Sequence, residues 1–153
     1  MSGEVLVCVD ESAISHAAVA AGLARLDPSL ELMLVTVIEG ADPMLVTGTG
    51  MAGGSMTMDE FRQLEDDRLA AAKDHLTEAA EAIGLVDARI MVLEGQPGPA
   101  ICHFAETEQA AAIVIGSRGR TGVKRFVLGS VSDHVVRHAP CPVVVTGAEV
   151  ELD

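Results

Sequence analysis

Aromatic and basic residues are scarce in this chain of 153 amino acids. It has three phenylalanines, no tryptophan and no tyrosine, so its core must be built from aliphatic side chains. The missing tryptophan and tyrosine also leave no platform on which single-stranded nucleic acid could stack its bases. Ten Lys and Arg residues against 23 Asp and Glu give a formal net charge of −13. That charge disfavours nucleic acids and anionic membranes as partners.

Cysteines are few, and long hydrophobic runs are missing. Cys8, Cys102 and Cys141 lie far apart and form no CxxC motif, which argues against a disulfide framework or a zinc site. No apolar run approaches the ~18 residues needed to cross a bilayer. The acidic start leads directly into a strand pattern and does not resemble a signal peptide. We therefore expect a cytoplasmic protein with no membrane partner and with buried structural thiols.

Apolar segments of strand length alternate with segments of helical pattern along the whole chain. The expected strands are residues 5–9, 30–38, 88–93, 111–115 and 143–146, and the expected helices are 12–26, 59–83, 97–108 and 129–138. Between the second strand and the second helix, residues 39–57 are rich in Gly, Thr and Met and predict a flexible loop. This alternation predicts one α/β domain over residues 1–153, an open five-stranded parallel sheet with helices on both faces.

A glycine-rich segment follows the fourth expected strand. Gly116 and Gly119 allow a tight turn in which backbone N–H groups approach an anion, and Gly129-Ser130 opens the next helix. No acidic residue occurs between positions 109 and 132, whereas four of the ten basic residues do. These four are Arg118, Arg120, Lys124 and Arg125. The segment predicts a phosphate-binding site.

Parallel sheets bind ligands at the carboxyl ends of their strands, where the strand order reverses. Asp10 and Gly116 follow the first and fourth strands, so this edge is where a ligand is expected. Two structural alternatives stay open. Asp10 can cap the helix that follows it, and Ser130-x-x-Asp133 has the pattern of a helix capping box.

Two other motifs are interpreted as structural. Gly48-Thr-Gly50-Met-Ala-Gly53 satisfies GxGxxG, but it lies about ten residues beyond the nearest strand, whereas dinucleotide fingerprints join a strand directly to a helix. We interpret it as part of the loop. His134 and His138 have i, i+4 spacing, which on a terminal helix is more typical of a partly solvated face than of a metal site.

Three segments together resemble the universal stress protein family. They are Ile113-Val-Ile-Gly-Ser-Arg-Gly, Leu128-Gly-Ser-Val-Ser and Ala139-Pro-Cys-Pro-Val-Val-Val. The glycine spacing matches the version of the family motif that accompanies ATP binding. The first strand with Asp10, the second strand with Thr36-Val37, and the turn Gly95-Gln-Pro97 also fit, so the resemblance covers nearly the whole chain.

The resemblance implies a fold of the Rossmann-like, adenine nucleotide α-hydrolase type and a binding site for ATP, ADP or AMP. The implied nucleotide-binding residues are Val9, Asp10, Val37, Gly116, Ser117, Arg118, Gly119, Gly129, Ser130, Val131 and Ser132. Val37 would lie near adenine, the glycines and serines would hold the phosphates, and Asp10 would lie near the ribose and phosphates or bind Mg²⁺ or Mn²⁺. The resemblance also implies a homodimer joined through Val143–Thr146.

The leading hypothesis is a dimeric, ATP-binding regulator or sensor in the stress response, with unknown protein partners. No Walker motif and no obvious base to activate water are present, so no catalytic residue is expected and ATP hydrolysis is weak at most. The alternatives are a nucleotide-independent dimeric scaffold and a slow metal-dependent ATPase. An enzyme that attacks the α-phosphate of ATP would need a second domain for its acceptor substrate, for which 153 residues leave no room.

Overall fold

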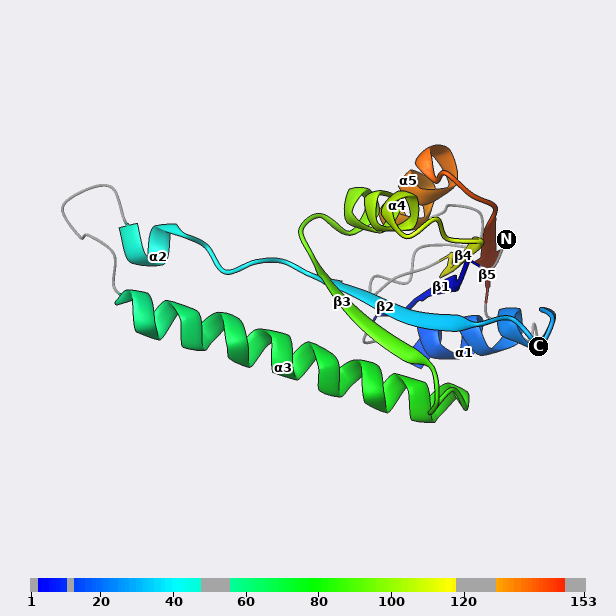
Figure 1. Ribbon diagram of the computed structural model, residues 1–153, viewed down its shortest axis with the longest axis horizontal. Helices are drawn as coiled ribbons and strands as arrows, with labels where there is room; N and C mark the ends of the chain where they lie inside the picture. Colours follow the sequence, from blue (N-terminus) through cyan, green and yellow to red (C-terminus); the bar gives the residue numbers. More distant parts are fainter. Residues whose placement is uncertain (1–2, 11–12, 48–55, 118–128, 148–153) are drawn as a thin grey trace, which may run out of the picture.

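The chain folds as an alternation of strands and helices (Figure 1). A computed structural model describes residues 3–10, 13–47, 56–117 and 129–147. In chain order the elements are β1 (Val5–Cys8), α1 (Ala13–Leu23), β2 (Leu32–Ile38), α2 (Met44–Thr47), α3 (Met58–Ile83), β3 (Arg89–Glu94), α4 (Pro97–Thr107), β4 (Ala112–Gly116), α5 (Ser130–His138) and β5 (Val143–Thr146). In the described ranges, no helix combines the length and apolarity needed to cross a membrane.

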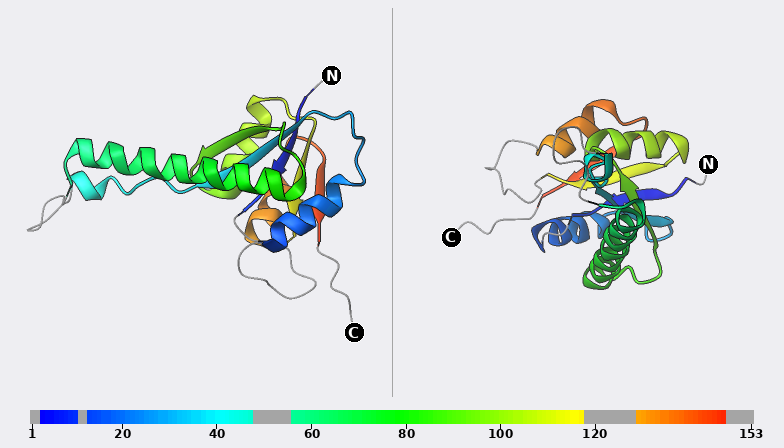
Figure 2. Two further views of the ribbon diagram at one scale, coloured as in Figure 1. Left: turned by 90° about the horizontal axis from the view of Figure 1, so that it is seen from below. Right: turned by 90° about the vertical axis from the view of Figure 1, so that its left-hand side faces the viewer.

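All five strands run parallel in one sheet, with the order β3-β2-β1-β4-β5. Helices α4 and α5 cover one face, and α1 and α3 cover the other, as the end-on view in Figure 2 shows. The predicted fold is therefore confirmed. The chain leaves β1 toward β2 on one side and later returns to β4 on the other side. The strand order thus reverses between β1 and β4, where a ligand site is expected.

The core is aliphatic and divided by the sheet into two layers. On β1, Val5 and Val7 pack toward α1 and α3, whereas Leu6 and Cys8 pack toward α4 and α5. Residues on both faces of this strand are at most 6% exposed. Burial on both faces explains why β1, β2 and β4 have continuous apolar sequences instead of alternating ones.

Helix α3 extends well beyond the sheet, as Figure 2 shows. Its 26 residues correspond to about 39 Å. All its buried residues, Ala72, Leu76, Ala79 and Ala80, lie in the C-terminal half. The N-terminal half, with the short helix α2 beside it, forms a projecting arm.

The structure differs from the sequence predictions at element ends and in the loop. Helix α1 ends at Leu23 and not near residue 26. After Leu23 the N–H groups of Arg25 and Leu26 donate to carbonyls three residues earlier, which forms turns instead of a further helical turn. The predicted loop 39–57 contains α2, whose four residues are too few to show a helical period. The GxGxxG segment, residues 48–53, lies outside the described residues.

Candidate functional site

The carboxyl ends of β1 and β4 lie side by side at the point where the strand order reverses. Cys8 is in register with Ile115, so the next residues along each strand are Val9 and Gly116. Adjacent strands are about 4.8 Å apart. The topology therefore brings together the first strand's Asp10 turn and the start of the glycine motif, as the sequence predicted.

A cavity of about 510 Å³ opens at this edge, on the side of the sheet covered by α3. Val9, Asp10 and Val37 all line it, together with the neighbouring Thr36, Ile38 and Glu39. Pro97, the first residue of α4, lies at its border. Three residues predicted from family resemblance thus share one cavity.

One wall of the cavity comes from α3 and was not predicted. Arg68, Ala71 and His75 are exposed residues of this helix that line the cavity, with the buried Ala72, Leu76 and Ala79 beside them. The small alanine side chains leave room between the helix and β2. The i, i+3, i+4 and i+7 spacing of these residues showed that they share a helix face. It could not show that this face meets the end of β2.

The two ends of the glycine motif meet in the structure. The Gly129 N–H donates to the Ser117 carbonyl at 2.9 Å, and the Ser117 N–H donates to the Thr146 carbonyl at 2.7 Å. The Ser132 hydroxyl donates to the Gly129 carbonyl at 3.0 Å and lies 3.4 Å from the Ser117 carbonyl. Ser132 is 2% exposed, so these contacts hold the end of β4 against the start of α5.

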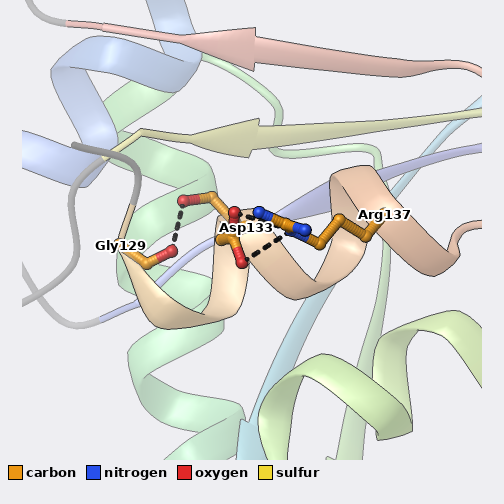
Figure 3. A network of polar contacts seen from close by, with 4 residues as sticks. Gly129, Asp133 and Arg137 are labelled. Carbon is orange, nitrogen blue, oxygen red and sulfur yellow. Dashed lines mark hydrogen bonds and ion pairs between the residues drawn. The ribbon is translucent and has the colours of Figure 1, made fainter. Parts of the chain in front are cut away.

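Helix α5 begins one residue earlier than a capping box with Ser130 as its N-cap would require. Its N-cap is Gly129, without a side-chain cap, and Ser130 is the first helical residue. Asp133 does not reach back to the cap, because both of its carboxylate oxygens accept from Arg137 Nε at 3.1 Å (Figure 3). The interpretation of Ser130-x-x-Asp133 as a capping box was therefore wrong.

The start of α5 is suited to an anion. A helix carries a partial positive charge at its N-terminus, where the first N–H groups have no partner within the helix. Ser130 is exposed there, whereas Val131 packs against the core on the α4 side. Val131 can therefore offer a ligand its backbone and not its side chain.

Some predicted site residues lie outside the described part of the chain. These are Arg118 and Gly119, together with the other basic residues of the segment. Among the described residues, no group of three His, Cys, Asp or Glu side chains could hold a metal ion by itself. Asp10 would therefore contribute a single carboxylate to any metal at this site.

The thiol of Cys8, directly before the cavity, is not a reactive group. Burial, with smaller contributions from the nearby thiols of Cys102 and Cys141, raises its pKa to about 12. All three cysteines are free. At neutral pH the Cys8 thiol is thus protonated, and it acts as a small apolar side chain of the core.

Comparison with known proteins identifies a family. The family model for the universal stress protein family matches residues 1–147. Universal stress protein YxiE of Bacillus subtilis is 31% identical over 152 residues, which cover 95% of this chain and 99% of YxiE. Universal stress protein MJ0531 of Methanocaldococcus jannaschii is 48% identical over 54 residues, 35% of this chain and 32% of that protein. The matches to a relative from Thermus aquaticus and one from Synechocystis cover 62% and 47% of the lengths of those proteins, less than two thirds of each.

Solved structures share the fold over nearly the whole chain. The universal stress protein from Archaeoglobus fulgidus in complex with dAMP is 25% identical with a TM-score of 0.57, covering 95% of this chain and 99% of that one. A universal stress protein in complex with cAMP is 21% identical with a TM-score of 0.61, covering 96% and 98%. A family protein from Arabidopsis thaliana with AMP bound is 21% identical with a TM-score of 0.58, covering 94% and 90%.

Proposed function

Because the chain belongs to the universal stress protein family, we propose that it binds an adenine nucleotide at the carboxyl edge of its sheet. ATP is the proposed ligand, with ADP and AMP as alternatives. The protein would act in the cytoplasm as a dimeric regulator whose contacts with partners depend on the bound nucleotide. One observation carries the proposal: a cavity at the carboxyl edge of the sheet is lined by Val9, Asp10 and Val37, and Val9 and Asp10 follow β1, the strand beside which the strand order reverses.

The cavity suits the adenosine part of the ligand. Its volume of about 510 Å³ lies within the ordinary range of small-molecule sites. Val37 and the alanines of α3 offer an apolar surface for the adenine ring, and the Asp10 carboxylate can accept hydrogen bonds from ribose hydroxyls. The dAMP, AMP and cAMP complexes of proteins with this fold support a nucleoside monophosphate as the minimal ligand.

The phosphates would lie over the start of α5. The cavity is lined from β1, β2, α3 and the start of α4, so a ligand seated in it would reach α5 by crossing the sheet edge between β1 and β4. Gly116, Ser117, Gly129 and Ser130 would meet the phosphates there, and the helix N-terminus favours their charge. The roles of Arg118 and Gly119 stay predictions. A local cationic segment is needed here because the chain as a whole has a charge of −13.

A divalent cation would arrive together with the nucleotide. Mg²⁺ or Mn²⁺ would take one ligand from Asp10 and the rest from phosphate oxygens and water. An Asp10→Asn variant should therefore bind ATP with less dependence on Mg²⁺. We propose no residue as a catalytic base, so ATP hydrolysis would be slow at most.

The binding proposal is tested by filling the cavity. Ala71→Phe places a bulky ring in the cavity, whereas Ala70→Phe adds the same ring at a neighbouring exposed position that does not line it. Isothermal titration with ATP and Mg²⁺ should show a loss of at least about tenfold in affinity for Ala71→Phe and an unchanged affinity for Ala70→Phe.

The same experiment separates the alternatives. Equal loss in both variants would place the nucleotide elsewhere. If ATP, ADP and AMP all leave the melting temperature of the wild-type protein unchanged, the nucleotide-independent dimeric scaffold would be favoured. Steady release of phosphate that needs Mg²⁺ and is lost in Asp10→Asn would favour the slow ATPase.

A further inference from the structure

We infer that the opposite, amino edge of the sheet holds a second binding site, for a basic segment of a partner protein. A groove of about 780 Å³ opens there, at the far end of the strands from the proposed nucleotide site. Glu4 precedes β1, Glu31 precedes β2, and Arg89 begins β3. Glu108, at the end of α4, completes the lining from the other face of the sheet.

The walls of the groove are short turns fixed by hydrogen bonds. In the turn before β2, the Ser29 N–H and hydroxyl both donate to Asp27 Oδ1, at 2.9 and 2.7 Å. In the turn before β3, Gly84 has a left-handed backbone with φ of 77°, and the Ala88 N–H donates to the Leu85 carbonyl at 3.0 Å. Preformed walls reduce the entropy that a partner must overcome on binding.

Exposed apolar side chains occur on both turns. Val86 is 68% exposed, the most of any large hydrophobic residue described, and Leu30 is 37% exposed. Both line the groove, and Ile90, at 36% exposure, follows Arg89 on the edge strand β3. Clustered exposed apolar groups next to a groove are typical of interaction sites.

The charge of the groove defines the chemistry of its partner. Its described lining contains four carboxylates, those of Glu4, Glu31, Asp87 and Glu108, and one cation, Arg89. Arg89 Nη1 already pairs with Glu4 Oε2 at 2.7 Å. Within the described part of the chain, the other three carboxylates have no hydrogen bond or ion pair.

Unpaired carboxylates beside exposed aliphatic groups fit a segment that carries Lys or Arg next to bulky apolar side chains. Nucleic acid and anionic lipid would be repelled by this surface. The described residues also offer no cluster of three groups able to hold a metal ion. A small amine would satisfy the carboxylates but would leave Val86, Leu30 and Ile90 exposed. A polypeptide segment satisfies both features, so we assign the groove to one.

A random 12-residue peptide library displayed on phage tests this assignment without knowledge of the natural partner. Selection on the full-length protein in the presence of saturating ATP should enrich peptides that combine Lys or Arg with Leu, Ile, Val or Phe. Synthetic copies of the enriched peptides are then titrated by fluorescence anisotropy against matched variants. The groove variants are Glu31→Lys/Glu108→Lys, which reverses charge, and Val86→Ser, which removes the apolar contact.

The controls carry the same changes elsewhere. Asp66→Lys/Glu106→Lys reverses two exposed charges outside the groove, and Val136→Ser replaces an exposed valine on α5. We expect the groove variants to lose at least about tenfold in peptide affinity and the controls to keep it. No enrichment, acidic peptides, or equal loss in groove and control variants would overturn the inference. So would peptide binding that requires self-association of the protein. ATP affinity should be unchanged in all four variants, which keeps this test separate from that of the nucleotide site.

Discussion

The Cys8 thiol couples the stability of the fold to pH. It lies in the central strand β1 and is 6% exposed, and burial raises its pKa from the ordinary 9.0 to about 12. Above pH 9 the thiol ionises in the unfolded chain but not in the folded one. Its contribution to stability is therefore complete below pH 9 and is lost as the pH rises toward 12. The expected slope is about 1.4 kcal/mol per pH unit at most.

Replacing Cys8 by Ala should remove this slope. The variant will be less stable at pH 8, because a buried sulfur is lost, but its free energy of unfolding should decline less between pH 9 and 10.5 than that of the wild type. Urea denaturation at several pH values measures both effects. Cys141→Ala is the comparison variant: that thiol is only partly buried, its own pKa is also raised by burial, and it is the smallest contributor to the raised pKa of Cys8, so a weaker change in slope is expected. Parallel pH curves for wild type and Cys8→Ala would contradict the prediction.

Gly98 allows α4 to pack closely on α5. A Cβ atom at this buried position would lie 2.8 Å from two ring carbons of His134 and 2.9 Å from its Cβ. Because the clash involves the Cβ of His134, a rotation of the imidazole cannot relieve it. Gly98→Ala should therefore destabilise the protein by about 1–3 kcal/mol. It should also weaken ATP binding, since α5 carries the proposed phosphate site.

A double-mutant cycle tests this contact. His134→Ala loses its ring contact with His138 and removes the two ring carbons from the clash, but it keeps the Cβ atom at 2.9 Å. In Gly98→Ala/His134→Ala, the free energy of unfolding measured in urea should recover part of the loss caused by Gly98→Ala alone, because the ring contacts are gone and the Cβ contact remains. Simple addition of the two single effects would show that the clash is relieved elsewhere.

At the scale of elements, the projecting half of α3 depends on its own N-terminus. Thr57 Oγ1 accepts from the Glu60 N–H at 3.2 Å, and the Glu60 carboxylate accepts from the Thr57 N–H at 2.7 Å. Hydrogen bonding of the Glu60 carboxylate to the Thr57 N–H, and to a smaller extent to its side chain, lowers the pKa of Glu60. The stabilisation by Glu60 is thus present above its ordinary pKa of 4.5 and is lost as the pH falls through the lowered value.

Thr57→Ala should loosen the arm and leave the core intact. The loss of a cap costs about 1 kcal/mol. That cost falls on the N-terminal half of α3, which contains no buried residue, because the first buried residue of the helix is Ala72. Hydrogen exchange followed by mass spectrometry should speed up over residues 58–70, with little change in melting temperature. Thr77→Ala, which removes an exposed hydroxyl bonded to the Lys73 carbonyl, is the matched control. Unchanged exchange in the arm would contradict the prediction.

Elements that are stabilised by local patterns could be predicted, and those that depend on distant contacts could not. The apolar runs of β1 and β4 and the stop at Gly84 follow from burial on both sheet faces and from a left-handed cap. The same sequence predicted the cavity residue Asp10 from its place after β1. The α3 wall was missed, because α3 and β2 are packed together by tertiary contacts that a local sequence pattern does not show. The start of α5 was misplaced by one residue, since Gly129 and Ser130 both suit an N-cap.

At the scale of the whole molecule, the two edge strands of the sheet differ in what they leave exposed. The first and last residues of β3, Arg89 and Glu94, are charged, whereas β5 consists of three valines and a threonine. Charged residues protect an edge from pairing, and an uncharged apolar edge invites it. The proposed homodimer through Val143–Thr146 therefore uses the less protected edge. Dimerisation would also place Thr146, whose carbonyl accepts from Ser117, close to both the interface and the proposed phosphate site.

Val145→Lys should convert the dimer to a monomer. Val145 is 36% exposed on β5, and a lysine there places an uncompensated charge in the interface. Sedimentation velocity should give the dimer mass for the wild type and the monomer mass for the variant at equal concentration. Val136→Lys, at 45% exposure on α5, adds the same charge outside β5 and should stay dimeric. A monomeric wild type, or a Val145→Lys variant that remains dimeric, would reject this interface. If the monomer binds ATP more weakly, the link from Thr146 through Ser117 to Gly129 is the path by which β5 pairing supports the nucleotide site.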